Sequence, residues 1–205
     1  CVYGLAVGDA LGVPFEFRPR DSFNATTMTS GGVWNQPIGT WSDDTSMTIA
    51  TCDALKENNK KIDLKAIQRN FVIWKDYDSY TAHNNTFDVG NTTAQALDRR
   101  VGLDDLYSNG NGSLMRIAPL IFVDCTDEEI AQVSAITHAH QYSIEACILY
   151  VKIGKELLKG KDLKTILDEL DCSDTFARLN NLKNLDRDFV LMLNQASGDR
   201  EILAR

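Results

Sequence analysis

Apolar residues recur at helical spacing along almost the whole chain, and the alternation typical of half-buried strands is hard to find. Pro14 stops one such segment, Asp63 and Thr126 are typical residues for the start of a helix, and Gly160 is typical of its end. The pattern predicts an all-α protein, with helices at about residues 1–13, 44–57, 63–77, 91–100, 126–140, 143–160 and 162–170.

Two long polar stretches separate these predicted helices, at about residues 18–39 and 78–90. Loops of that length are uncommon in compact helical domains and are usually functional. No internal repeat and no linker-like stretch divides the 205 residues, of which 43% are hydrophobic. We therefore expect a single domain over residues 1–205, with its functional groups in or beside the long loops.

Composition narrows the classes of function. The formal net charge of -8 argues against nucleic-acid binding, which needs lysine and arginine against phosphate, but not against a small anionic ligand. No apolar run approaches the roughly 20 residues of a membrane span, and no signal-peptide pattern stands at the start. Five widely spaced cysteines without a C-x-x-C pair predict reduced thiols and a cytoplasmic protein.

The stretch "GTWSDDTSM" places Ser42, Asp43 and Asp44 directly before an apolar helical segment. A hydroxyl and two acids at that place are typical of a helix N-terminus, and the pattern alone favours capping. The same oxygens suit a hard cation such as Mg²⁺ or Mn²⁺, and at the first turn two adjacent acids can converge on one ion. Further ligands would have to come from elsewhere, and Asp9 and Glu16 are candidates within the chain.

Three weaker motifs follow along the chain. "NGNGS", Asn109–Ser113, stands at an apparent helix start and either brings backbone N–H groups close to an anion or forms a simple turn. "DVGN", Asp88–Asn91, either orients a sugar hydroxyl and moves a proton or forms an Asx-turn. In "THAH", His138 and His140 stand two residues apart, so on a helix they would point to opposite sides; we expect one ring inside the protein and the other at a cleft.

No single motif is decisive, but their order is. "GLAVGDALGVPFEF", "GTWSDDTSM", "DVGNTT", "GNGSLMRIAPL" and "THAH" together resemble the ADP-ribosylglycohydrolase family, from about residue 4 to residue 150. The resemblance implies a compact, orthogonally packed all-α fold and a binuclear Mg²⁺ or Mn²⁺ site. It implies hydrolysis of the N- or O-glycosidic bond between ADP-ribose and a modified protein side chain, so the expected partner is ADP-ribose or an ADP-ribosylated protein.

Matching the motifs residue by residue implies roles for this chain. Ser42, Asp43 and Asp44 would be metal ligands, and Glu16 and Asp88 would assist proton transfer. The residues matched to substrate binding are Asn91, Gly110, Asn111, Gly112, Ser113, Met115 and His138.

One family motif is not found. Members close the metal site with a late G-x-D-x-D-T motif, whereas here the chain after Asp188 reads "FVLMLNQASGDREILAR". Three explanations stay open: the C-terminal part is missing or replaced, the remaining ligands lie in other residues, or activity is lost. The last would make the chain an ADP-ribose-binding or structural, crystallin-like relative. A metal phosphohydrolase is a third, weaker alternative, permitted by the glycine loop alone.

Overall fold

The structure, a computed structural model, describes residues 2–19 and 21–170. Within these residues the chain forms helices, with only two isolated β-bridges. The α-helices are α1 (Val2–Gly12), α2 (Asp43–Glu57), α3 (Leu64–Tyr77), α4 (Asn91–Arg99), α5 (Asp127–Ala135), α6 (Gln141–Leu158) and α7 (Leu163–Glu169). Short 3-10 turns are η1 (Val13–Phe15), η2 (Leu106–Ser108), η3 (Leu114–Arg116) and η4 (Ala118–Phe122). The all-α prediction is confirmed for this part of the chain.

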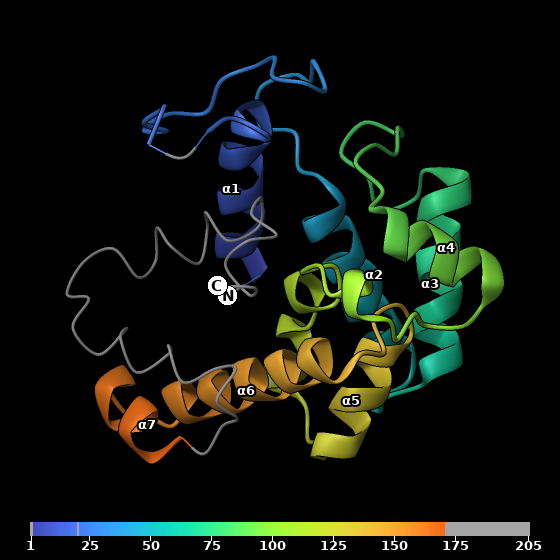
Figure 1. Ribbon diagram of the computed structural model, residues 1–205, viewed down its shortest axis with the longest axis vertical. Coiled ribbons are helices and arrows are strands. Elements are labelled where there is room, and N and C mark those ends of the chain that lie inside the picture. The colour runs from blue at the N-terminus through green and yellow to red at the C-terminus, as the bar shows by residue number, and fades with distance from the viewer. Residues whose placement is uncertain (1, 20, 171–205) are drawn as a thin grey trace.

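Helix α2 is the central element. It packs against α1 on one side and α3 on the other, and the turns η3 and η4 also contact it. Helix α6 crosses the lower part of the molecule in Figure 1, with α5 and α7 packed against it. The largest buried apolar side chains come from these contacts and include Met47, Ile67, Phe71, Trp74, Ile117, Leu120, Ile130, Val133 and Val151.

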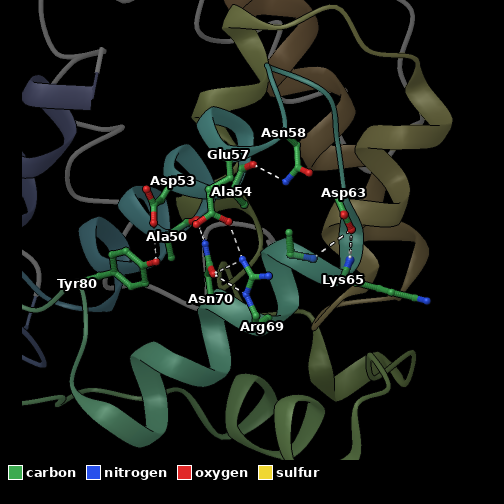
Figure 2. Close-up of polar contacts among 11 residues, drawn as sticks. Ala50, Asp53, Ala54, Glu57, Asn58, Asp63, Lys65, Arg69, Asn70 and Tyr80 are labelled. Atoms are coloured by element: carbon green, nitrogen blue, oxygen red, sulfur yellow. Dashed lines mark hydrogen bonds and ion pairs between the residues drawn. The ribbon is translucent and has the colours of Figure 1, made fainter.

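Local signals in the sequence explain several helix ends. The Asp63 carboxylate accepts hydrogen bonds from the N–H groups of Lys65 and Ala66, as expected of a cap. Thr126 and Glu129 form the expected capping box, and Gly160 ends α6 with φ of 86°. Figure 2 shows how α2 and α3 are joined, with the Asn70 amide donating to the carbonyl oxygen of Ala50.

The structure differs from the predicted helices in two places. Helix α5 ends at Ala135, not near residue 140, because the backbone of residues 137–139 pairs with Leu103 in one of the β-bridges. The segment after "GNGS" is not an α-helix but the two turns η3 and η4. Pro119 lies inside it and has no N–H, so it cannot continue an α-helical ladder.

No helix in the described part of the chain is long and apolar enough to cross a membrane. Cys52, Cys125 and Cys147 are free thiols, and the other two cysteines lie outside the described residues.

Candidate functional site

The start of α2 is capped by a residue of another helix. Ser42 occupies the N-cap position but makes no capping bond with its own side chain. The carboxylate of Asp9, on α1, accepts bonds from the Ser42 N–H at 3.0 Å, the Ser42 hydroxyl at 2.8 Å, the Thr45 N–H at 3.1 Å and the Thr45 hydroxyl at 2.6 Å. Burial raises the pKa of Asp9, and these hydrogen bonds oppose that shift. Asp9 therefore supplies the cap that the sequence suggested for Ser42.

Asp43 and Asp44 form the first turn of α2 and are buried, with exposed fractions of 8% and 9%. Burial raises the pKa of both carboxyls well above the usual value. The next largest cause is a neighbouring carboxylate: Asp44 acts on Asp43, and Asp9 acts on Asp44. The helix N-terminus favours negative charge at these two positions. The neighbouring carboxylates oppose it, and no basic side chain is among the groups that act on Asp43 and Asp44.

Glu16 and Asp88 come from distant segments and lie together. Glu16 follows η1, and Asp88 lies in the loop of residues 78–90 with a left-handed backbone, φ 54°. Their carboxyls are within hydrogen-bonding reach, and burial followed by the Asp88 charge raises the pKa of Glu16 to about 8. The indole N–H of Trp34 donates to Glu16 Oε2 and holds that carboxyl in place. This pair can share one proton.

These acids fit a divalent cation by their chemistry. Every charged group that acts on Asp43 and Asp44 is itself an acid, so buried negative charge there needs a cation or protons to balance it. Carboxylate and hydroxyl oxygens are the ligands that Mg²⁺ and Mn²⁺ prefer. Their arrangement does not by itself form a metal site: among the described residues, no three acid, histidine or cysteine side chains form a group that could hold a metal ion.

A second cluster surrounds the glycine loop. A Cβ atom placed on Gly112 would lie 2.6 Å from His138 Cε1 and 3.1 Å from the Thr93 hydroxyl, so only glycine fits there. Gly110 also faces the ring of His138, at 3.9 Å from Nε2 on the same measure. His138 itself is 2% exposed. The glycine loop, the start of α4 and the "THAH" segment therefore meet at Gly112.

The two histidines of "THAH" differ as the spacing suggested. His138 lies inside the protein, while His140 is partly exposed and caps α6, its Nδ1 accepting a hydrogen bond from the N–H of Tyr142. Neither lies within a helix, which corrects the premise of the prediction. The internal position of His138 agrees with it, whereas neither hollow described below contains His140, so its place at a cleft stays a prediction.

The other predicted substrate residues occupy varied environments. Met115 joins the glycine loop to α2, because its carbonyl oxygen lies 3.3 Å from the hydroxyl of Thr48. Ser113 is fully buried and its hydroxyl is 2.9 Å from that of Ser134. Asn91 is exposed at the first position of α4, and Asn111 is partly buried. The helix expected after the loop is only the turn η3, three residues long, so no long helix dipole points at an anion there.

Sequence reasoning missed several supporting residues. Trp34 lies between Phe17 and Phe87, with ring centroids 6.2 Å and 5.9 Å away, and reaches Glu16 from the first long loop. Arg116 and Thr137 lie beneath His138. Arg116 and Thr137 stand in the motifs quoted above, but contacts between separate segments leave no periodic pattern in a sequence.

Two surface hollows lie elsewhere. One, of about 270 Å³, is lined by residues of α3 and α5 and by Ile136, and the other, of about 620 Å³, by residues 59–62, 122–124 and Glu129. Neither contains a predicted site residue, so the acids and the glycine loop remain the better candidate for chemistry.

Comparisons with known proteins agree with the order of the motifs. The sequence model described as ADP-ribosylglycohydrolase matches residues 1–202. The ADP-ribosylarginine hydrolase Tri1 of Pseudomonas putida (strain GB-1) is 32% identical over 176 residues, which cover 80% of this chain and 47% of that protein. The ADP-ribosyl-[dinitrogen reductase] glycohydrolase of Rhodospirillum rubrum is 29% identical over 203 residues, 91% of this chain and 63% of that protein.

The fold also resembles that of a solved structure. The chain named "ADP-ribosylglycohydrolase-related protein complex" superposes with a TM-score of 0.70 at 26% identity, over 88% of this chain and 64% of that one. The present chain thus spans about half of the Pseudomonas relative, at 47% of its length, 63% of the Rhodospirillum relative and 64% of the solved chain.

Proposed function

This chain belongs to the ADP-ribosylglycohydrolase family, and we propose that it hydrolyses the glycosidic bond that joins ADP-ribose to a modified protein side chain. The observation that carries the proposal is the meeting of Glu16 and Asp88 beside the buried acids Asp43 and Asp44. Asp9, Glu16 and Asp88 all oppose the charge of the buried Asp43 and Asp44, which is unfavourable for folding unless a cation or protons balance it.

Mg²⁺ or Mn²⁺ is the cofactor in this proposal, with Ser42, Asp43 and Asp44 as the residues that would hold it. A bound ion would supply a water of lowered pKa near the anomeric carbon. Asp9 would contribute indirectly, because its hydrogen bonds to Ser42 and Thr45 fix the first turn of α2 on which these ligands stand.

Glu16 and Asp88 would move the protons. In the hydrolysis, a bond forms between water oxygen and the anomeric carbon while the bond from that carbon to the acceptor nitrogen or oxygen breaks. One carboxyl of the pair gives a proton to the leaving side chain, and a carboxylate of the pair takes one from water. Contact between the two groups lets the pair hold a single proton before and after the step.

The glycine loop would hold the ADP-ribose. Backbone N–H groups of the loop would bind the ligand, and Gly112 lets the loop backbone pack closely against His138. Asn91 and Asn111 offer amide groups beside the same loop. Ser113 and Met115 would support it, the first from the interior and the second through Thr48.

The test is release of free ADP-ribose. The purified chain is incubated with ADP-ribosylated arginine and ADP-ribosylated serine peptides, with Mg²⁺, with Mn²⁺ or with a chelator, and the products are separated by chromatography. Release that requires the metal, and that is lost in Asp43→Asn but kept in Asp104→Asn, is the expected result. Asp104 is a matched control because it is an exposed aspartate outside the cluster.

A non-catalytic ADP-ribose binder or structural relative is the second candidate, because among the described residues no three acid, histidine or cysteine side chains form a group that could hold a metal ion. Calorimetry with ADP-ribose separates the two. Binding that ignores Mg²⁺, with no release of ADP-ribose from either peptide, would replace hydrolysis by binding. Neither binding nor release would leave a structural role.

A further inference from the structure

Arg116 is a buried cation with an unusual set of partners. Its exposed fraction is 0%, its guanidinium lies 4.5 Å from the centroid of the Phe71 ring, and its Nε and Nη1 atoms have no hydrogen-bond partner. Burial lowers the pKa of Arg116 to about 10, and the Cys147 thiol, not a carboxylate, is the group that opposes the shift. Burying a guanidinium without a carboxylate is costly, which indicates a role beyond stability.

The one arginine nitrogen with partners, Nη2, points toward the residues that precede His138. It lies 2.9 Å from the Thr137 hydroxyl, 3.2 Å from the carbonyl oxygen of Val133 and 3.5 Å from that of Ser134. The Thr137 hydroxyl in turn lies 2.9 Å from His138 Nδ1. Arginine, threonine and histidine therefore form a chain of contacts in the interior.

The direction of these hydrogen bonds follows from their chemistry. A guanidinium can only donate, so the Thr137 oxygen accepts from Arg116. The hydroxyl has a single hydrogen, and His138 Nδ1 is the acceptor within reach. Nδ1 of a ring that accepts this hydrogen carries no proton, so a neutral ring carries its proton on Nε2.

We propose that Arg116, acting through Thr137, is a positioning residue that holds His138 in its neutral Nε2–H tautomer, so that Nε2 donates a hydrogen bond to a ligand oxygen at the glycine loop. The geometry brings Nε2 to the glycine loop, because a Cβ on Gly112 would lie only 3.0 Å from it. The ligand part of the proposal rests on the proposed function, whereas the tautomer stands on the internal geometry alone.

Two further features keep the ring fixed and neutral. The backbone on either side of His138 is held by Leu103, which bonds to Thr137 and Ala139, and by the Ser134 hydroxyl 3.0 Å from the His138 carbonyl oxygen. Burial and the Arg116 charge lower the pKa of His138 to about 3. His138 is therefore a constant donor near neutral pH and takes no part in the proton transfers assigned to Glu16 and Asp88.

The tautomer is measured directly by NMR on protein labelled with ¹⁵N in the histidine rings. The chain has three histidines, His83, His138 and His140, so the assignment is simple. His138 is expected to show a protonated Nε2 and an unprotonated Nδ1, unchanged between pH 8 and pH 5. A protonated Nδ1, or an imidazolium at pH 6, would overturn the proposal whatever the behaviour of any variant.

Variants test the roles of threonine and arginine. Thr137→Val keeps the shape but removes the hydroxyl, and Arg116→Met removes the guanidinium; each is expected to give His138 a mixture of tautomers. Thr137→Ser should restore the single tautomer. His140 serves as internal reference, because its Nδ1 bond to Tyr142 is untouched. An unchanged His138 spectrum in folded Thr137→Val would overturn the relay, and if that variant does not fold, Arg116→Met decides.

Calorimetry with ADP-ribose tests the ligand part. Thr137→Val is expected to bind about 3- to 10-fold more weakly, the loss of one hydrogen bond, with Thr137→Ser close to wild type. An altered tautomer with unchanged affinity would refute donation to the ligand. No binding by wild type at all would count against the proposed function and the ligand part together, while the NMR result still decides the tautomer.

Discussion

The acids at the start of α2 and the cluster under the glycine loop are both buried and polar, yet they are built in opposite ways. The charged groups that act on Asp43 and Asp44 are all acids, and they oppose the charge of these two carboxyls. His138, Thr137 and Arg116 form a chain in which donors meet acceptors, apart from two arginine nitrogens. The acids therefore need a cation or protons to balance their charge, whereas the ring of His138 is held in place before a ligand binds.

Asp9 lies beside the acids at the start of α2, but its carboxylate, like the groups around His138, has hydrogen-bond partners within the protein. Asp9→Ala leaves two N–H groups and two hydroxyls of Ser42 and Thr45 without their acceptor. We expect the free energy of unfolding, from urea titration, to fall by about 3 kcal/mol, the largest effect of any variant here. Asp9→Asn, which keeps one acceptor oxygen, should lose less. Equal losses in both variants would show that shape, not acceptance, matters.

The neutral state of His138 predicts a dependence of stability on pH. Its pKa falls from 6.5 to about 3 on folding, so the unfolded chain binds more protons between these values and stability decreases as pH falls. From pH 7 to pH 5 this single group should remove about 2 kcal/mol. The measurement is urea unfolding of wild type and His138→Gln at both pH values. The variant should lose less by that amount, and parallel losses would mean that His138 is not held neutral.

Substitution at the acids of α2 should raise stability, in contrast to substitution of Asp9. Asp44→Asn removes a buried like charge, so without metal the free energy of unfolding at pH 7 should rise by about 1 kcal/mol. The same change should abolish any rise of melting temperature with Mg²⁺ or Mn²⁺. Thermal unfolding with and without each ion, with Asp104→Asn alongside, checks both parts. A loss of stability like that of Asp9→Ala would erase the distinction between ligand and cap.

Much of this arrangement was predictable from the sequence, for physical reasons that are local. Helical spacing predicted the all-α fold, and Asp63, Thr126 and Gly160 marked real helix ends because capping acts over three or four residues. The ordered motifs predicted the family, although the roles of the matched residues stay predictions.

The missing information is tertiary. Ser42 looked like a cap, but the capping oxygen comes from Asp9, 33 residues earlier in the chain. The helix predicted through "THAH" ended early because pairing with Leu103 competes with it. The identities of Trp34 and Arg116 do not predict which carboxyl or hydroxyl each side chain contacts.

Trp34 provides the finest test of the comparison, because its N–H is a neutral donor to Glu16. Trp34→Phe keeps a ring between Phe17 and Phe87 but removes the N–H that holds Glu16. We expect only about 0.5 kcal/mol of lost stability, since the bond is partly exposed. If Glu16 moves protons, kcat for release of ADP-ribose should fall about 3-fold while KM stays constant, because a looser carboxyl spends less time aligned.

Gln36→Ala is the matched control for Trp34→Phe. Its side-chain amide bonds to the carbonyl oxygen of Trp34, so losing it loosens the same turn without touching the bond to Glu16. If both variants lower kcat equally, the turn matters only as structure. If Trp34→Phe alone lowers kcat, Glu16, beside the acids at the start of α2, is already held in place, and the two regions differ in degree of preorganisation more than in kind.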